Sequence, residues 1–189
     1  MENPAITPYL NSDSVTVRPA RPDDIVTCSH VNGDYQTNYV WQMHFQEQKH
    51  RVQVVFNQVR LPRSMAAHYP FQQPDLLASF EQESHLWVAC YDGQVVGCLG
   101  GAGDDLRGVF AINNLIVDQA ARRNGIGKRL LQTIHIIAGQ QGCQSLTIAL
   151  QTKNDPAIRF AQKMGFVFCG YDDKYFPNGD IALIFSMKI

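Results

Sequence analysis

The chain has 189 residues, 45% of them hydrophobic and 17% charged, which is the composition of an ordinary globular protein. Its formal net charge of -1 gives no global attraction to nucleic acid or to an acidic membrane surface. No apolar run in the sequence approaches the roughly 20 residues that span a bilayer. We therefore expect neither nucleic acid nor membrane as a partner, although a locally basic site is compatible with this balance.

Cysteine usage and the first residues indicate the compartment. The five cysteines are an odd number without a CxxC pair, which is typical of reduced thiols and argues against a disulfide framework or a zinc site. The six histidines show no metal-ligand spacing, so we expect no bound metal. The first 15 residues lack the basic region and apolar run of a secretory signal. A cytoplasmic protein is therefore expected.

The first half of the chain gives few clear elements. Residues 14–20 alternate as a strand does, and residues 21–31 have the pattern of a short helix with acidic residues in its first turn. Residues 33–85 are rich in aromatic residues and glutamine and are hard to assign beyond a strand within 51–59. Loop signals in that region are Pro62, Pro70 and Pro74.

The second half is more regular. Two β-rich runs within 85–101 flank Asp92-Gly93, the strongest short hairpin signal. A strand at 108–118 precedes an amphipathic helix from Ile126 to about Gln140. The remaining expected elements are a strand at 145–151, a helix within 154–165, and two strands within 166–171 and 181–189. This order predicts an α+β (mixed α/β) fold in one domain over residues 1–189.

Glycines and basic residues stand together at the start of that helix. A P-loop is excluded because Arg122 replaces its first glycine and Arg129 its Ser/Thr, and Leu130 breaks a dinucleotide fingerprint. The spacing instead fits [RQ]-x-x-G-x-[GA] between a strand and a helix. Unpaired N–H groups and the dipole at a helix N-terminus favour an anion, and glycine allows a pyrophosphate close to the main chain. The alternative is an ordinary glycine turn with a solvated basic face.

The run NNLIVDQAARRNGIGKRLL, followed by NDPAIRFAQKMGF, resembles the Gcn5-related N-acetyltransferase (GNAT) family in two successive motifs. The resemblance covers residues 86–189 and implies the GNAT fold, a mostly antiparallel central sheet with a splayed parallel strand pair and helices on both faces. Residues 86–189 would then be the acetyl-CoA-binding core and residues 13–85 the acceptor-side half. The implied activity is that of an acyltransferase, in which a primary amine attacks acetyl-CoA directly and no acyl-enzyme forms.

The resemblance also assigns the cofactor contacts. The main chain of one strand would meet the pantetheine arm, the glycine-rich segment would hold the pyrophosphate, and three residues of the second helix motif would line the other side. The expected cofactor-binding residues are Leu115, Ile116, Val117, Arg122, Arg123, Asn124, Gly125, Ile126, Gly127, Lys128, Asn154, Ala157 and Phe160.

Two positions depart from the family pattern. Asn113 stands where many members carry a glutamate base, and Ala161 stands where many carry a tyrosine acid. Tyr175 and Tyr171, near the final hairpin, are the candidates to replace them, although each could be an aromatic packed at a strand end. Asn113 remains a catalytic candidate beside Asn114, since an amide pair inside an apolar strand is unusual. Two satisfied structural amides are the alternative.

The acceptor side rests on weaker similarities. Tyr35, Trp41 and Asp34 suit an organic cation through ring faces and ion pairing, or else fill the core. The segment YVWQM is similar to streptothricin-type acetyltransferases, and Y-F-P-x-x-D-I-A is similar to protein N-terminal acetyltransferases. We expect a small-molecule amine as the acceptor. The alternatives are a peptide N-terminus and a non-catalytic acetyl-CoA-binding module, and a homodimer stays open.

Overall fold

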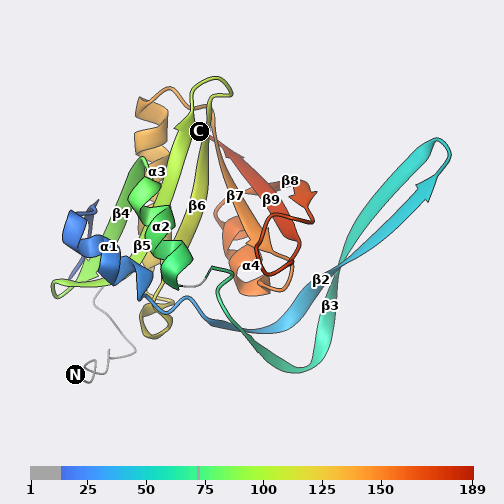
Figure 1. The fold of residues 1–189 in the computed structure, drawn as a ribbon, viewed down its shortest axis with the longest axis horizontal. Helices are drawn as coiled ribbons and strands as arrows, with labels where there is room; N and C mark the ends of the chain where they lie inside the picture. The colour runs from blue at the N-terminus through green and yellow to red at the C-terminus, as the bar shows by residue number, and fades with distance from the viewer. Residues whose placement is uncertain (1–13, 72) are drawn as a thin grey trace. The chain divides into compact units, whose positions relative to one another are not determined.

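A computed structural model describes residues 14–71 and 73–189 (Figure 1). The strands in this part of the chain are β1 (Val15–Pro19), β2 (Tyr35–Gln48), β3 (Arg51–Ala67), β4 (His85–Tyr91), β5 (Gln94–Asp104), β6 (Val109–Val117), β7 (Ser145–Gln151), β8 (Val167–Asp172) and β9 (Ala182–Lys188). The helices are α1 (Pro22–Ser29), α2 (Gln73–Gln82), α3 (Ile126–Gln140) and α4 (Asp155–Lys163), with a 3-10 turn η2 (Gln119–Ala121). None of these helices combines the length and apolarity needed to cross a bilayer.

Within the described residues, seven strands form one sheet in the order β1-β4-β5-β6-β7-β9-β8, and β2 and β3 form a separate two-stranded ribbon. Strand β6 pairs antiparallel with β5 and parallel with β7. The predicted α+β fold, with a mostly antiparallel sheet and a parallel pair, is therefore confirmed.

Contacts within the chain group the residues into two compact units. Of the described residues, the first contains 14–33, 71, 73–149 and Ser186–Ile189, and the second contains Asp34–Pro70 and Leu150–Phe185. A single domain over 1–189, divided into halves 13–85 and 86–189, remains a prediction, and residues 1–13 of it lie outside the described residues.

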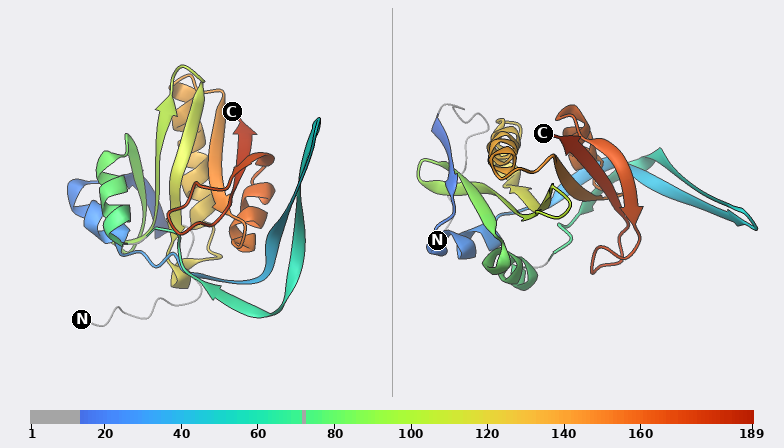
Figure 2. Two further views of the ribbon diagram at one scale, coloured as in Figure 1. Left: turned by 45° about the vertical axis from the view of Figure 1, so that its right-hand side comes forward. Right: turned by 90° about the horizontal axis from the view of Figure 1, so that it is seen from above.

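Helices cover both faces of the strands in the first unit. Figure 2 shows α3 on one face and α1 with α2 on the other. The apolar period of α3 predicts its buried face well, except that Leu131 is buried and Ile137 is half-exposed. The fully covered side chains of this helix are Ile126, Leu130, Leu131, Ile134 and Ala138. Each large one contributes roughly 1.5–3 kcal/mol by leaving water, so α3 fixes the position of the loop that precedes it.

The predicted hairpin at Asp92-Gly93 is confirmed. Both residues have positive φ, 47° at Asp92 and 78° at Gly93, as a type I′ turn requires. This turn joins β4 to β5, and β5 then lies between β4 and β6. Strand β6, which carries Leu115–Val117, pairs with the second strand of this hairpin.

Two elements near the prolines differ from the predictions. Strand β3 runs through Pro62, where a loop was expected, because the register there jumps from Thr37↔Met65 to Tyr39↔Arg60 and Pro62 lies in the irregular stretch between. The second is α2, which was not predicted. Its Pro74 stands in the first turn, where the missing N–H costs nothing, so this proline begins a helix instead of marking a loop.

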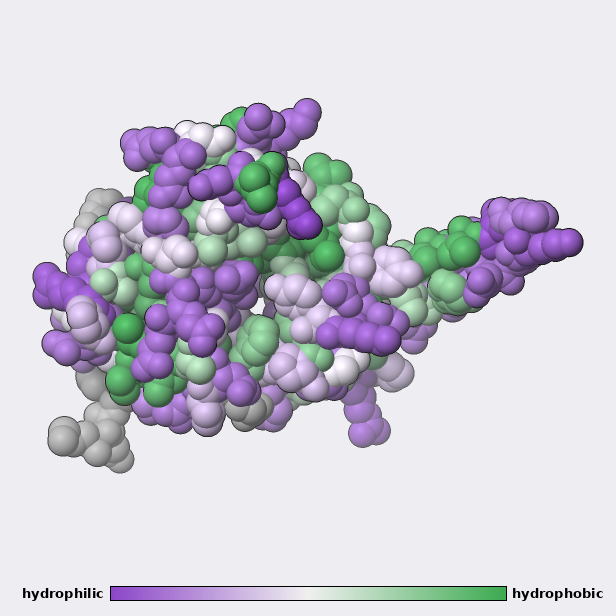
Figure 3. Space-filling model, turned by 45° about the horizontal axis from the view of Figure 1, so that its top comes forward, coloured by the Kyte–Doolittle hydropathy of each residue, from purple (hydrophilic) through white to green (hydrophobic). Residues whose placement is uncertain are grey.

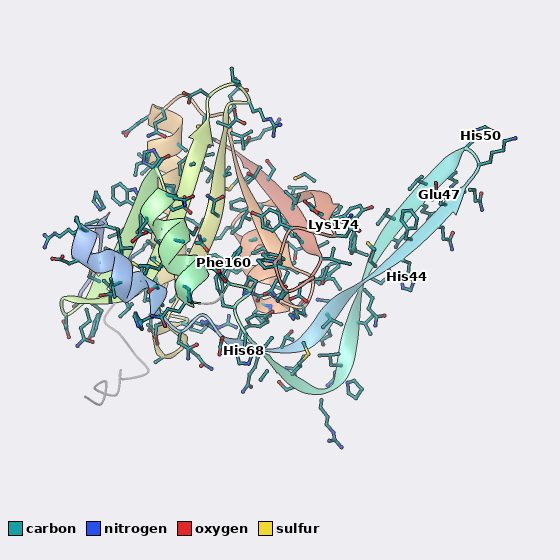
Figure 4. The ribbon with its side chains drawn as sticks, in the orientation of Figure 1. His44, Glu47, His50, His68, Phe160 and Lys174 are labelled. Atoms are coloured by element: carbon teal, nitrogen blue, oxygen red, sulfur yellow. The ribbon has the colours of Figure 1, made fainter. Side chains whose placement is uncertain are left out.

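The β2–β3 ribbon belongs to the second unit. His44, Glu47 and His50, labelled in Figure 4, are exposed on this ribbon and its turn. Apolar side chains are also exposed there, Phe45 by 52% and Val52 by 62%. Figure 3 shows this apolar surface behind a hydrophilic tip. The aromatic and β-branched composition that was hard to assign is therefore that of a strand pair with both faces largely uncovered.

Candidate functional site

The glycine-rich loop connects β6, through η2, to α3 within the first unit. Gly125 is the N-cap of α3 and has a φ of 76°, in the left-handed region that favours glycine. Because glycine has no side-chain acceptor, the first N–H groups of α3 lack the side-chain cap that helix α4 has. There, the Oδ1 of Asn154 accepts the N–H of Ala157 at 3.2 Å. The N-terminus of α3 is therefore suited to an external acceptor.

The basic and polar residues of this loop divide into two groups. Arg122 donates its Nε to the carbonyl of Val117 at 3.0 Å, and the amide of Asn124 donates to the carbonyls of Ala121 and Arg122 at 3.2 and 3.1 Å. These two side chains brace the loop. Arg123 and Lys128 are exposed, and Arg123 adopts a φ of 70°. They are the cations that the loop presents to solvent.

Strand β6 separates from β7 beyond its first four residues. The parallel pairing joins Val109–Ile112 to Ser145–Ile148, whereas the pairing of β6 with β5 continues to Val117. In the described residues, the second half of β6 therefore has a paired strand on its β5 side alone. Leu115, Ile116 and Val117, the predicted pantetheine contacts, lie in this half.

A β-bulge reorients the two asparagines of β6. The register passes from Gly101↔Ile112 to Gly100↔Asn114, so Asn113 is the inserted residue. In a regular strand these neighbouring side chains would point to opposite faces. Here the Nδ2 groups of both asparagines donate to the same carboxylate, that of Glu83. The bulge therefore brings both amides to one carboxylate.

Glu83, the residue that follows α2, was missed by the sequence analysis. Its two oxygens accept the Asn113 amide at 3.2 and 3.1 Å, and Oε1 also accepts Asn114 and Ser79 at 3.4 Å each. Burial raises the pKa of this carboxyl, while the hydrogen bonds from Asn113, Asn114 and Ser79 act in the opposite direction. The amide pair inside an apolar strand indicated a polar partner, but only the fold identifies it.

Tyr35, predicted to contact the acceptor, is buried in the second unit. Its hydroxyl donates to the Oε1 of Gln151 at 3.1 Å, and the Nε2 of Gln151 donates to Asp180. Lys153 pairs with the same carboxylate at 2.7 Å. Burial raises the pKa of Tyr35 above its usual range. In this structure Tyr35 anchors a polar network of the second unit.

The other two predicted acceptor residues also belong to the second unit. The Nε1 of Trp41 is buried and has no hydrogen-bond partner among the described residues, which is unusual for an indole. Asp34 accepts the Nδ1 of His68 at 2.9 Å and the N–H of Tyr69 at 3.2 Å, and its side chain is 44% exposed. Trp41 therefore retains an unused donor, and Asp34 an accessible carboxylate.

The predicted tyrosines pack against other rings of the second unit. Tyr171 meets Phe56 edge to face with ring centroids 5.4 Å apart, and Tyr175 meets Phe176 in the same way at 4.9 Å. Tyr175 is 40% exposed. Both tyrosines belong to the second unit, whereas Asn113 belongs to the first.

Helix α4 presents the remaining predicted residues. Ala157 and Phe160 are half-exposed, while Ile158 and Ala161 are buried on the other side (Figure 4 labels Phe160). Ala161 is only 2% exposed, so the core leaves little room for a larger side chain there. The residue at the position of the family tyrosine is therefore a buried alanine, which has no proton to donate.

The cap on α4 gives a stability prediction. We expect Asn154→Ala to lower the free energy of unfolding by about 1 kcal/mol, because the N–H of Ala157 loses its acceptor. Asn154→Asp keeps the acceptor and is expected to be within about 0.5 kcal/mol of the wild type. Urea unfolding measures both variants. Equal stability of Asn154→Ala and the wild type would show that the cap contributes nothing.

Comparison with known proteins agrees with this geometry. A model of the acetyltransferase (GNAT) family matches residues 45–166. A streptothricin acetyltransferase of Streptomyces lavendulae is 25% identical over 175 residues, which are 90% of this chain and 93% of the relative.

Two solved structures share the fold. Nourseothricin acetyltransferase superposes with a TM-score of 0.79 at 21% identity, over 93% of this chain and 98% of that one. A Bacillus anthracis protein described as a streptothricin acetyltransferase, solved with acetyl coenzyme A, has a TM-score of 0.71 at 18% identity, over 93% of this chain and all of that one.

Proposed function

Because this chain belongs to the acetyltransferase (GNAT) family, we propose that it transfers the acetyl group of acetyl-CoA to a primary amine of a small cationic molecule. One observation carries the proposal: two features occur together in the first unit. The N-terminus of α3 has no side-chain cap, and strand β6 is not paired with β7 beyond Ile112. The first suits an anion and the second suits a chain that hydrogen-bonds to a strand.

The residues present fit acetyl-CoA. A Cβ built on Gly125 would meet nothing within 4 Å, so the main chain is open beside the start of α3. The amides of residues 126–128 would hold the pyrophosphate, and Arg123 and Lys128 would add charge-assisted contacts. The main chain of Leu115–Val117 would bind the pantetheine arm. When bound, acetyl-CoA supplies the activated acyl group, and a strand N–H of β6 would polarise its carbonyl.

The acceptor class is supported by the streptothricin acetyltransferase relative, whose name gives streptothricin as its acceptor. On this chain, the accessible carboxylate of Asp34 and the ring face of Trp41 are proposed acceptor contacts in the second unit. Tyr175 and Tyr171 are retained as proposed proton donors to the leaving sulfur. Tyr35 is better explained as a structural residue, because its hydroxyl is already engaged with Gln151.

The experiment that tests this function measures CoA release from acetyl-CoA by chromatography. The acceptor panel contains streptothricin-type and amino-sugar antibiotics, polyamines, amino acids and short peptides. We expect release that depends on a cationic small-molecule amine. Release with peptides alone would move the acceptor to a peptide N-terminus. If acetyl-CoA binds but no amine causes release of CoA, the proposed catalysis is contradicted. Chromatography is preferable to thiol dyes because the protein has five cysteines of its own.

A further inference from the structure

The carboxylate of Glu83 is held without a cation. Its partners in the described part of the chain are the neutral donors Asn113, Asn114 and Ser79, and the amide of Asn114 also donates to Ser79 at 3.0 Å. A partly buried carboxylate usually pairs with an Arg or Lys, because its charge is costly to desolvate. Holding it with neutral donors keeps it fixed and leaves it able to accept a proton.

The backbone makes room for this group. A Cβ built on Gly100 would lie 3.0 Å from the Oε1 of Glu83 and 3.1 Å from its Cδ, so the carboxylate lies directly over the glycine of β5. The β-bulge at the same level turns both asparagines toward it. Glu83 is thereby fixed beside Asn113 and Asn114, which directly precede Leu115–Val117. Along the strand these asparagines are one or two residues, of about 3.3 Å each, from the first proposed pantetheine contact.

Solvent and small molecules can reach Glu83. An open groove of about 420 Å³ in the first unit is lined by Glu83 together with Phe80, Leu86 and Trp87. That volume is within the range of small-molecule sites. The other charged and titratable side chains that line it are Arg21, Glu81 and His85.

We infer that Glu83 is the catalytic base of the proposed transfer, taking the place of the family glutamate that Asn113 replaces, and that Asn113 and Asn114 are its positioning residues. The inference rests on the proposed function. The amine nitrogen forms a bond to the thioester carbonyl carbon, the C–S bond breaks, and the thiolate leaves with the bonding electron pair. The proton released by the nitrogen passes to a carboxylate oxygen of Glu83, and solvent removes it afterwards.

The raised pKa of Glu83 suits this role. A carboxylate with a higher pKa is a stronger base, and the nitrogen becomes more acidic as its lone pair enters the new bond. Activity requires the ionised carboxylate, so kcat/KM is expected to rise with pH through the raised pKa of Glu83. That acidic limb should lie above the range of exposed glutamates.

The test compares Glu83→Gln with the wild type and with Asp105→Asn, which removes an exposed carboxylate from a turn of the same unit. We expect Glu83→Gln to lose at least about 100-fold in kcat and to lose the acidic limb of the pH profile. Its acetyl-CoA affinity by calorimetry and its Tm should match those of the wild type. Asp105→Asn should keep full activity.

A second variant tests the positioning role. Asn113 is exposed, so Asn113→Ala should fold, and it removes a hydrogen bond that favours the charged carboxylate. We expect the acidic limb of Asn113→Ala to move to higher pH, and an NMR titration of the Glu83 carboxyl in the free protein to move in the same direction. A purely structural role would leave the kinetic midpoint unchanged while the NMR midpoint of Glu83 still moves.

The outcomes separate the two proposals. If the wild type is active, and Glu83→Gln keeps its kcat within twofold and its acidic limb unchanged, the assignment of Glu83 is overturned. The proposed function then stands. A wild type that transfers acetyl to no amine overturns the proposed function and the assignment together. Loss of activity in Glu83→Gln with an acidic limb that persists in the residual rate also overturns the assignment, and would indicate His85 or another titrating group.

Discussion

Gly125→Val is expected to weaken acetyl-CoA binding at least tenfold, while the protein stays folded. Gly125 has a φ of 76°, and a β-branched residue in that conformation costs roughly 1–2 kcal/mol. The backbone of the variant is expected to rotate away from this conformation and turn the first N–H groups of α3. These N–H groups then no longer point toward the pyrophosphate, and the valine side chain occupies the open space beside residue 125. Calorimetry with acetyl-CoA measures the change.

Gly93→Val is the matched control for this variant. Gly93 has a φ of 78° in the β4–β5 turn, and a side chain there would also meet nothing within 4 Å. The two substitutions therefore introduce the same strain at two places in the first unit. Gly93→Val should lose a similar amount of stability and keep its acetyl-CoA affinity. Equal affinity of Gly125→Val and the wild type would remove the pyrophosphate from residues 122–128.

Gly101→Ala is expected to lower the free energy of unfolding by about 3 kcal/mol, the largest effect we predict on stability. A Cβ at this position would lie 2.4 Å from the carbonyl oxygen of Ala111 and 2.5 Å from a ring carbon of Phe110. Phe110 is fully buried, so neither neighbour can move without disturbing the sheet at the bulge. Urea unfolding of the variant measures the loss.

Gly103→Ala, two residues further along β5, serves as its control. The nearest atoms to a Cβ there are 3.9 Å away, an ordinary contact distance, so its stability should stay within about 0.5 kcal/mol of the wild type. If Gly101→Ala proved as stable as Gly103→Ala, the tight packing described at the bulge would be wrong. A folded Gly101→Ala with reduced activity would show that the bulge also serves catalysis.

The parts of the fold that the sequence predicts are those in which local chemistry and tertiary structure agree. The turn at Asp92-Gly93 and the apolar face of α3 each have a local cause that is visible in a few residues. Of the β2–β3 ribbon only a strand within 51–59 was predicted, and α2 was not predicted, because the proline signals at Pro62 and Pro74 compete with strand and helix patterns there. Pro62 is tolerated in an irregular register and Pro74 in a first helical turn, and neither context is visible locally.

The candidate site divides in the same way. The glycine-rich loop is contiguous, so its residues could be identified together from their spacing. Glu83 is 30 residues from Asn113 in the chain, and the two meet only because β5 places α2 against the bulge of β6. The hydroxyl of Tyr35 is engaged by Gln151, a partner 116 residues away. Residues whose role depends on such distant partners could not be assigned from sequence alone.

The measurement that tests the central claim most directly follows the acetyl group itself. Isotope-labelled acetyl-CoA is incubated with the full chain and a streptothricin-type amine, and mass spectrometry locates the label. We predict label on an amine of the small molecule, CoA as the coproduct, and none on the protein, as direct attack requires. Label retained in acetyl-CoA for every amine tested, or transferred only to the protein, would contradict the account.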